Sequence, residues 1–156
     1  DKAYSGKIIF KSIDERELTP NLDNIAIIHQ NPYVFHTSVR YNLTLYQDYS
    51  DSLLISTLKK VGLWEACCHQ LDYELTGDNF SGGQIINLEI ARAILRGKQV
   101  ILADEMMASL DAASSKEISN VLKQLPNSII EIAHHYNLED YDAVYRIENK
   151  SIVRIK

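Results

Sequence analysis

The sequence lacks the features of a membrane-spanning or secreted chain. No apolar stretch in its 156 residues approaches the roughly 20 residues that are needed to cross a bilayer. The first residues, DKAYSGK, contain no apolar core of a secretory signal. We therefore expect a water-soluble domain.

Cysteine and basic charge are also scarce. The two cysteines, Cys67 and Cys68, are adjacent, which suits neither an ordinary disulfide nor a CxxC metal knuckle, and we interpret them as structural filler. The 16 basic residues are outnumbered by 21 acidic ones, so the net charge is -5, and no basic block interrupts this balance. The electrostatic footprint of a nucleic-acid-binding protein is therefore missing.

Proline and glycine are too few to divide the chain into separate domains. The sequence contains 3 prolines and 6 glycines, with no internal repeat or low-complexity linker. Its hydrophobic fraction of 46% is sufficient for one ordinary core. One domain with two lobes is the economical interpretation.

Short apolar runs rich in Ile, Val and Leu indicate strands. Because these runs do not alternate with polar residues, they predict strands that are buried on both faces. They lie at residues 8–10, 25–28, 100–103 and 129–133. Near the C-terminus, two β-rich runs flank a polar Glu148-Asn149-Lys150 centre, which predicts a hairpin.

Helical spacing appears between these runs. Ile118, Val121, Leu122 and Leu125 recur at i, i+3, i+4 and i+7, which predicts an amphipathic helix that stops before Pro126. A strand, helix and strand in this order imply a parallel crossover with ligands at the carboxyl ends of the strands. Over residues 51–61, Leu54, Leu58 and Val61 lie on one helical face, and Gly62 then breaks the pattern. We therefore expect a largely helical insertion between residues 35 and 95.

The strongest chemical signal is the segment Phe80-Ser81-Gly82-Gly83-Gln84, which is followed by IINLEIARAIL. Glycines at a helix start let the backbone approach a phosphate, whose charge is stabilised by free N–H groups and by the helix dipole. The hydroxyl of Ser81 adds a further donor. A loop that only caps a helix is the alternative, and SGGQ followed by ARAIL disfavours it.

Two acids end the apolar run at residues 100–103. Asp104 is placed to hold a magnesium ion, because Mg²⁺ prefers oxygen ligands. Glu105 is placed to polarise the water that attacks a γ-phosphate. The alternative is a pair of solvated acids that closes a strand, which is preferable unless other chemistry lies nearby.

Further polar residues do follow neighbouring runs. Gln30 comes after the run at residues 25–28, and its amide oxygen could reach a metal and the attacking water. His134 ends the run at residues 129–133, where it could meet the γ-phosphate, and Asp111 follows the two acids. In isolation each would be an ordinary structural or surface residue, but their order changes that interpretation.

In this order the motifs resemble those of the nucleotide-binding domain of an ABC transporter, and they fit nearly the whole chain. Gln30 matches the Q-loop, residues 80–84 the signature usually written LSGGQ, residues 100–105 the Walker B strand with its catalytic glutamate, residues 109–111 the D-loop, and His134 the switch histidine. Phe35, Val39, Asn42 and Leu43 also resemble the exporter pattern LFxxTIxxNI. An exporter-like subclass is therefore favoured.

The resemblance implies an α/β fold, namely a partial P-loop NTPase (ABC ATPase) core with a mostly parallel sheet plus an α-helical subdomain. Residues 1–35 and 96–156 would form the core lobe. Residues 36–95 would form the helical subdomain that carries the signature.

The resemblance also implies an ATPase that powers transport across a membrane, with ATP and Mg²⁺ as cofactors. Two such domains would close head to tail around two ATP molecules, beside a membrane-spanning partner at the cytoplasmic face of the cell membrane. In this arrangement Glu105, His134 and Gln30 would serve catalysis in the chain's own site, with Asp104 and Gln30 near the metal. The opposite subunit's nucleotide would be contacted by Ser81, Gly82, Gly83, Gln84 and Asp111.

A Walker A loop, GxxxxGK[ST], is missing from the sequence. The Gly6-Lys7 pair is a decoy, because Asp1 and Ile8 occupy the positions of the first glycine and of the hydroxyl residue. Residues 6–10 instead fit the strand that follows the Walker A helix in the family, so we expect the sequence to begin downstream of that loop in a longer polypeptide. On its own the chain should bind MgATP weakly and hydrolyse it negligibly.

Some positions depart from the family pattern. Met106 and Met107 replace the usual Pro-Thr, and Ala133 stands where threonine is common. Because the four polar residues of the chain's own site survive, these changes do not indicate a degenerate ATPase. Two alternatives stay open, namely a soluble ABC-type ATPase not linked to transport and a non-catalytic interaction module derived from an ABC domain.

Overall fold

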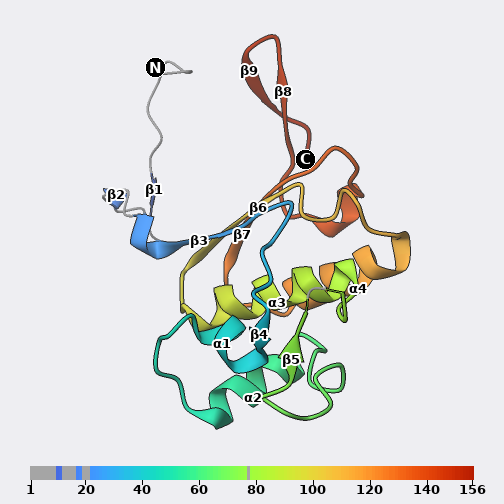
Figure 1. Ribbon diagram of the computed structural model, residues 1–156. Helices are drawn as coiled ribbons and strands as arrows, with labels where there is room; N and C mark the ends of the chain where they lie inside the picture. The colour runs from blue at the N-terminus through green and yellow to red at the C-terminus, as the bar shows by residue number, and fades with distance from the viewer. Residues whose placement is uncertain (1–9, 12–16, 19–21, 77) are drawn as a thin grey trace.

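The computed structural model describes residues 10–11, 17–18, 22–76 and 78–156 of the chain (Figure 1). Most of the predicted strand at residues 8–10 and the Gly6-Lys7 decoy lie outside the described residues. In chain order the elements are β1 (Phe10–Lys11), β2 (Glu17–Leu18), η1 (Leu22–Asn24), β3 (Ile25–Ile28), β4 (Thr37–Ser38), α1 (Val39–Thr44), α2 (Asp51–Lys60), β5 (Glu74–Leu75), α3 (Gly82–Leu95), β6 (Val100–Asp104), α4 (Ala112–Lys123), β7 (Ser128–Ile132), η2 (Leu138–Asp140), β8 (Tyr145–Glu148) and β9 (Ser151–Arg154).

A parallel sheet of three strands, in the order β3-β6-β7, forms the centre of the α/β core. Ile28 pairs with Ala103, and Asp104 pairs with Ile132, so the strands end at one common edge. Three of the four predicted apolar runs thus form this sheet, and α4 is the predicted helix between its last two strands. The α/β class with a parallel sheet is confirmed.

The prediction that these strands are buried on both faces is wrong. Burial alternates along β3 and β7, and the side chains of Ile27, Ile130 and Ile132 are 43%, 53% and 60% exposed. Helices α3 and α4 lie on one side of the sheet in Figure 1, and α3 contacts β3 directly. Among the described residues no helix covers the opposite face, and the apolar side chains on that face therefore remain exposed.

A second group of helices lies on the far side of α3 from the sheet (Figure 1). Helix α2 has the predicted buried face, with Leu54, Leu58 and the following Val61 fully buried. Gly62 then adopts a φ of 70°, a left-handed conformation that glycine tolerates and that ends the helix. The short antiparallel pair β4–β5 joins Thr37 to Leu75 and is an element that the sequence did not reveal.

The C-terminal hairpin is confirmed. Strands β8 and β9 pair antiparallel, and Asn149 and Lys150 both have positive φ, as a two-residue type I′ turn requires. Every residue of the two strands is exposed, and Figure 1 shows the hairpin projecting away from the helices.

The two adjacent cysteines differ in environment. Cys67 is fully buried, which fits the interpretation as structural filler, and burial raises the pKa of its thiol to about 11. Cys68 is exposed, so that interpretation is wrong for this residue. In the part of the chain that the structure describes, no helix is both long and apolar enough to cross a membrane.

Candidate functional site

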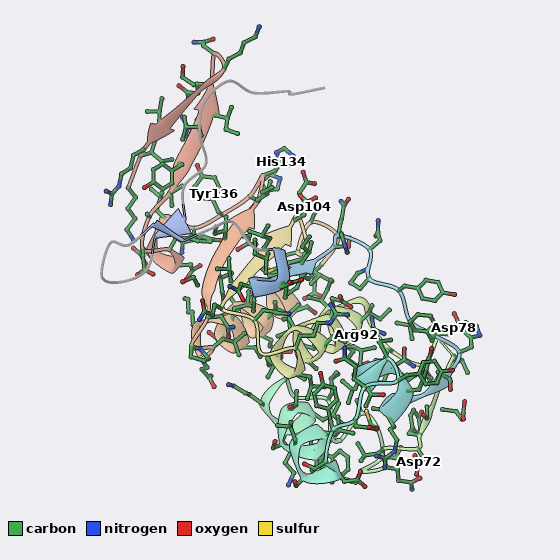
Figure 2. All side chains as sticks on the ribbon, turned by 90° about the vertical axis from the view of Figure 1, so that its left-hand side faces the viewer. Asp72, Asp78, Arg92, Asp104, His134 and Tyr136 are labelled. Atoms are coloured by element: carbon green, nitrogen blue, oxygen red, sulfur yellow. The ribbon has the colours of Figure 1, made fainter. Side chains whose placement is uncertain are left out.

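The carboxyl edge of the parallel sheet gathers four of the predicted site residues. Asp104 ends β6 with an exposed side chain, and Glu105 follows it. Gln30 lies two residues beyond β3, and His134 lies two residues beyond β7. Because parallel neighbours end at the same edge, loops from three strands meet there. Figure 2 shows His134 and Asp104 at the same end of the sheet.

Glu105 and His134 are brought into direct contact. The Nε2 atom of His134 lies 2.9 Å from Oε1 of Glu105, a distance at which an imidazole N–H donates a hydrogen bond to a carboxylate oxygen. The Glu105 side chain is only 29% exposed, whereas that of His134 is 78% exposed. The carboxylate is therefore held at the edge of the core by a partner that remains open to solvent.

The backbone of Glu105 explains how this carboxylate is presented. Its φ is 47°, in the left-handed region that a glutamate rarely occupies. Its N–H donates to the carbonyl oxygen of Ile132 over 2.9 Å, which extends the β6–β7 pairing by one bond. Strained backbone held by surrounding structure often occurs at functional sites.

The SGGQ segment begins α3 with a capping box. The hydroxyl oxygen of Ser81 accepts a bond of 3.3 Å from the Gln84 N–H, and Gln84 Oε1 accepts one of 2.9 Å from the Ser81 N–H. Gln84 therefore fixes the helix start, a structural role that the sequence analysis did not assign to it. The N–H groups of Gly82 and Gly83 lie in the first turn, where a helix supplies no carbonyl partner.

The two signature glycines also allow close packing against the start of α4. A Cβ atom at Gly82 would lie 3.2 Å from Cδ2 of Leu110, and one at Gly83 would lie 3.4 Å from Cβ of Ser114. Residues 109–111 and the signature are thus in contact within one chain. The glycines serve this packing as well as leaving room at the helix start.

Asp111 caps α4. Its Oδ1 accepts bonds of 2.9 Å from the N–H groups of Ala113 and Ser114, and its Oδ2 accepts one of 2.8 Å from the Ser114 hydroxyl. The bonds from Ser114, followed by the smaller contribution of Ala113, lower the pKa of this carboxyl below its ordinary value. The sequence predicted a nucleotide contact for Asp111 and did not reveal that this residue caps α4.

We expect removal of this cap to lower stability. Asp111→Ala should reduce the melting temperature of the chain at pH 7 by more than Asp111→Asn, because asparagine keeps an oxygen that caps the helix. A lowered carboxyl pKa stabilises the fold above the ordinary value near 3.9 and ceases to do so as the pH falls through the lowered pKa. The difference between wild type and Asp111→Asn should therefore shrink in acid. Equal melting temperatures for all three proteins would contradict the cap.

A second polar pair lies along β7. Glu131 accepts a hydrogen bond of 2.7 Å from the Tyr141 hydroxyl. Burial raises the pKa of Glu131, and the tyrosine bond lowers it by a smaller amount. The pKa of Tyr141 is raised by burial and then by Glu131. This pair joins η2 and its flanking residues to the sheet.

The donor set at the sheet edge is compatible with a magnesium ion that a phosphate also ligates. Asp104 offers an exposed carboxylate, and Gln30 offers an amide oxygen. The described residues contain no group of three or more His, Cys, Asp or Glu side chains able to hold a metal by themselves. Mg²⁺ commonly takes only one or two carboxylates and completes its shell with water and phosphate oxygens.

Comparison with known proteins shows which family the chain belongs to. The family profile described as ABC transporter matches residues 1–108. The chain belongs to the ABC transporter family. The predicted family is thereby confirmed.

Relatives of this ABC transporter chain include export proteins. The chain is 34% identical over 162 residues to the microcin-J25 export ATP-binding/permease protein McjD of Escherichia coli, which covers 97% of this chain and 28% of the relative. It is 30% identical over 162 residues to the ATP-dependent lipid A-core flippase of Francisella novicida, covering 96% and 27%. It is 34% identical over 145 residues to the pleiotropic ABC efflux transporter of multiple drugs YBT1 of Candida glabrata, covering 78% and 9%. The chain spans less than a third of each of these relatives.

Proposed function

We propose that this chain forms part of the ATP-hydrolysing domain of an ABC exporter and acts at the cytoplasmic face of a membrane. The observation that carries this proposal is the 2.9 Å contact between Glu105 and His134, at the sheet edge that also presents Asp104 and Gln30. The exporter relatives support the link to transport. A membrane-spanning domain is the partner that such a site would drive.

Each residue of this edge has a proposed role. Glu105 orients the attacking water and accepts its proton as a general base. His134 holds the Glu105 carboxylate in place and donates to the terminal phosphate of the nucleotide. Asp104 and Gln30 would hold Mg²⁺, which supplies positive charge to the phosphate oxygens when it is bound.

The signature serves a second ABC domain that is paired head to tail with this one. In this proposal the first-turn N–H groups of Gly82 and Gly83 and the hydroxyl of Ser81 face a phosphate held by the opposite domain. Gln84 stabilises the start of α3 through the capping box, and Asp111 stabilises the start of α4 as its N-cap. In this proposal the core lobe of the domain consists of residues 1–35 and 96–156, and the helical subdomain consists of residues 36–95.

The chain on its own is expected to bind MgATP only weakly. Its 156 residues contain no GxxxxGK[ST] loop, so no backbone cradle and no phosphate-binding lysine of that type are present. Titration calorimetry should detect no micromolar binding of MgATP to the chain, whereas the assembled transporter should bind it. Micromolar affinity of the chain alone would contradict the first expectation, and an assembled transporter that binds no MgATP would contradict the proposed function.

A further inference from the structure

Arg92 is an almost fully buried arginine near the end of α3. It is 4% exposed, and its guanidinium donates to four oxygens. Nε bonds to the Asn42 carbonyl at 2.7 Å and Nη2 to Asn42 Oδ1 at 3.0 Å. Nη1 bonds to the Tyr33 carbonyl at 2.8 Å and to Glu89 Oε2 at 2.7 Å. The Arg92 side chain therefore links α3 to α1 and to the segment that follows Gln30.

Asn42 extends this hydrogen-bond network to the next residues of the same segment. It is fully buried, and its Oδ1 accepts a bond of 2.9 Å from the Phe35 N–H. Its Nδ2 donates to the carbonyl oxygens of Phe35 at 2.9 Å and Ser38 at 3.1 Å. The guanidinium carbon of Arg92 also lies 5.9 Å from the centre of the Phe35 ring, within cation–π range.

The ion pair with Glu89 does not by itself account for a buried arginine at this place. A buried ion pair such as Arg92–Glu89 is often replaceable by well-packed apolar residues at no net loss of stability. What an apolar side chain could not do is hold the main-chain carbonyls of Tyr33 and Asn42 in a fixed position. Lysine could not do so either, because its ammonium lacks the planar fork of donors.

We propose that Arg92 is a positioning residue for Gln30, an inference that rests on the proposed function. Gln30 precedes the anchored Tyr33 carbonyl by three residues and stands beyond the end of β3. Arg92 fixes the far end of this short loop to α3, so the loop is held at both ends. Figure 2 shows Arg92 between the sheet and the helices beyond it, away from Asp104 and His134. Arg92 therefore acts through the loop and does not touch the reacting groups.

The first test measures the loop without nucleotide. Hydrogen–deuterium exchange of the assembled transporter should be faster in residues 31–38 of Arg92→Lys than in wild type. Exchange in β6 and β7 should be unchanged. The control is Arg96→Lys, which alters an exposed arginine one helical turn further along. Unchanged exchange in residues 31–38, or an equal increase in the sheet, would overturn the proposal.

The second test asks whether Arg92 acts through Gln30. Arg92→Lys should raise the Mg²⁺ concentration for half-maximal ATP turnover about tenfold, the usual effect of losing support behind a metal ligand. In a Gln30→Ala background the same substitution should add less than about twofold, because coupled sites are not additive. Fully multiplicative effects would overturn the proposal. A wild-type transporter without ATP turnover would instead refute the proposed function. The exchange experiment would then still test whether Arg92 holds residues 31–38 in place.

Discussion

Replacing Glu105 with glutamine is expected to lower ATP turnover by the assembled transporter at least about a hundredfold while MgATP binding persists. Glutamine has nearly the same shape, and its amide oxygen can still accept the bond that His134 Nε2 gives to Oε1 in the wild type. It cannot accept a proton from water at neutral pH. The loss should therefore appear in kcat, measured by phosphate release at saturating MgATP.

A matched substitution separates this effect from a general loss of charge. Glu117→Gln removes an exposed carboxylate from α4, away from the sheet edge, and should leave turnover within about twofold, because distant surface changes have small effects. If Glu105→Gln retained most of its turnover, Glu105 could not be the general base. A loss of nucleotide binding in that variant would point instead to damage of the site.

The second large effect concerns the core of the helical region. Leu54 is fully buried on α2, whereas its neighbour Leu53 is 43% exposed. Leu54→Ala removes apolar contacts and leaves a cavity, so it should lower the free energy of unfolding of the chain by about 2–5 kcal/mol. Urea unfolding followed by circular dichroism measures this change.

Leu53→Ala is the control, since the two substitutions are adjacent on one helix and remove the same atoms. It should cost much less, because 43% of the Leu53 surface already faces solvent, whereas none of the Leu54 surface does. Similar losses in the two variants, or a larger loss for Leu53→Ala, would contradict the orientation of α2. A selective effect at Leu54 would place the predicted apolar face of this helix in the core.

Local patterns in the sequence predicted the elements that local physics controls. The helical spacing of Leu54, Leu58 and Val61 located α2, and Gly62 marked its end because glycine tolerates a positive φ without strain. Pro126 likewise marked the limit of α4, which ends at Lys123. The polar centre with Asn149 located the hairpin turn.

Features that depend on distant parts of the chain could not be predicted. The β4–β5 pair joins residues about 37 positions apart and only two long, which leaves no periodic signal. Apolar runs in β3 and β7 indicated strands but not which face was covered, because a covering helix is a tertiary feature. Arg92 offered a signal that was missed, since it is a charged residue at a helix position flanked by Ala91 and Ala93.

The sequence predicted which residues form the candidate site more completely than it predicted the contacts between them. The sequence placed Glu105 and His134 after neighbouring strands, and the structure shows that they touch. It did not reveal that Gln84 and Asp111 are helix caps, because capping depends on the conformation of the flanking backbone. The nucleotide roles of the site residues stay predictions.

The most direct test of the whole account is the position of the nucleotide in an experimental structure. A cryo-EM structure of the assembled transporter, carrying Glu105→Gln and supplied with MgATP, would provide it. The account predicts that the γ-phosphate lies within about 2.6–3.2 Å of the His134 imidazole of one domain, with Ser81 of the opposite domain facing the same phosphate. A nucleotide that sits away from both residues would contradict it.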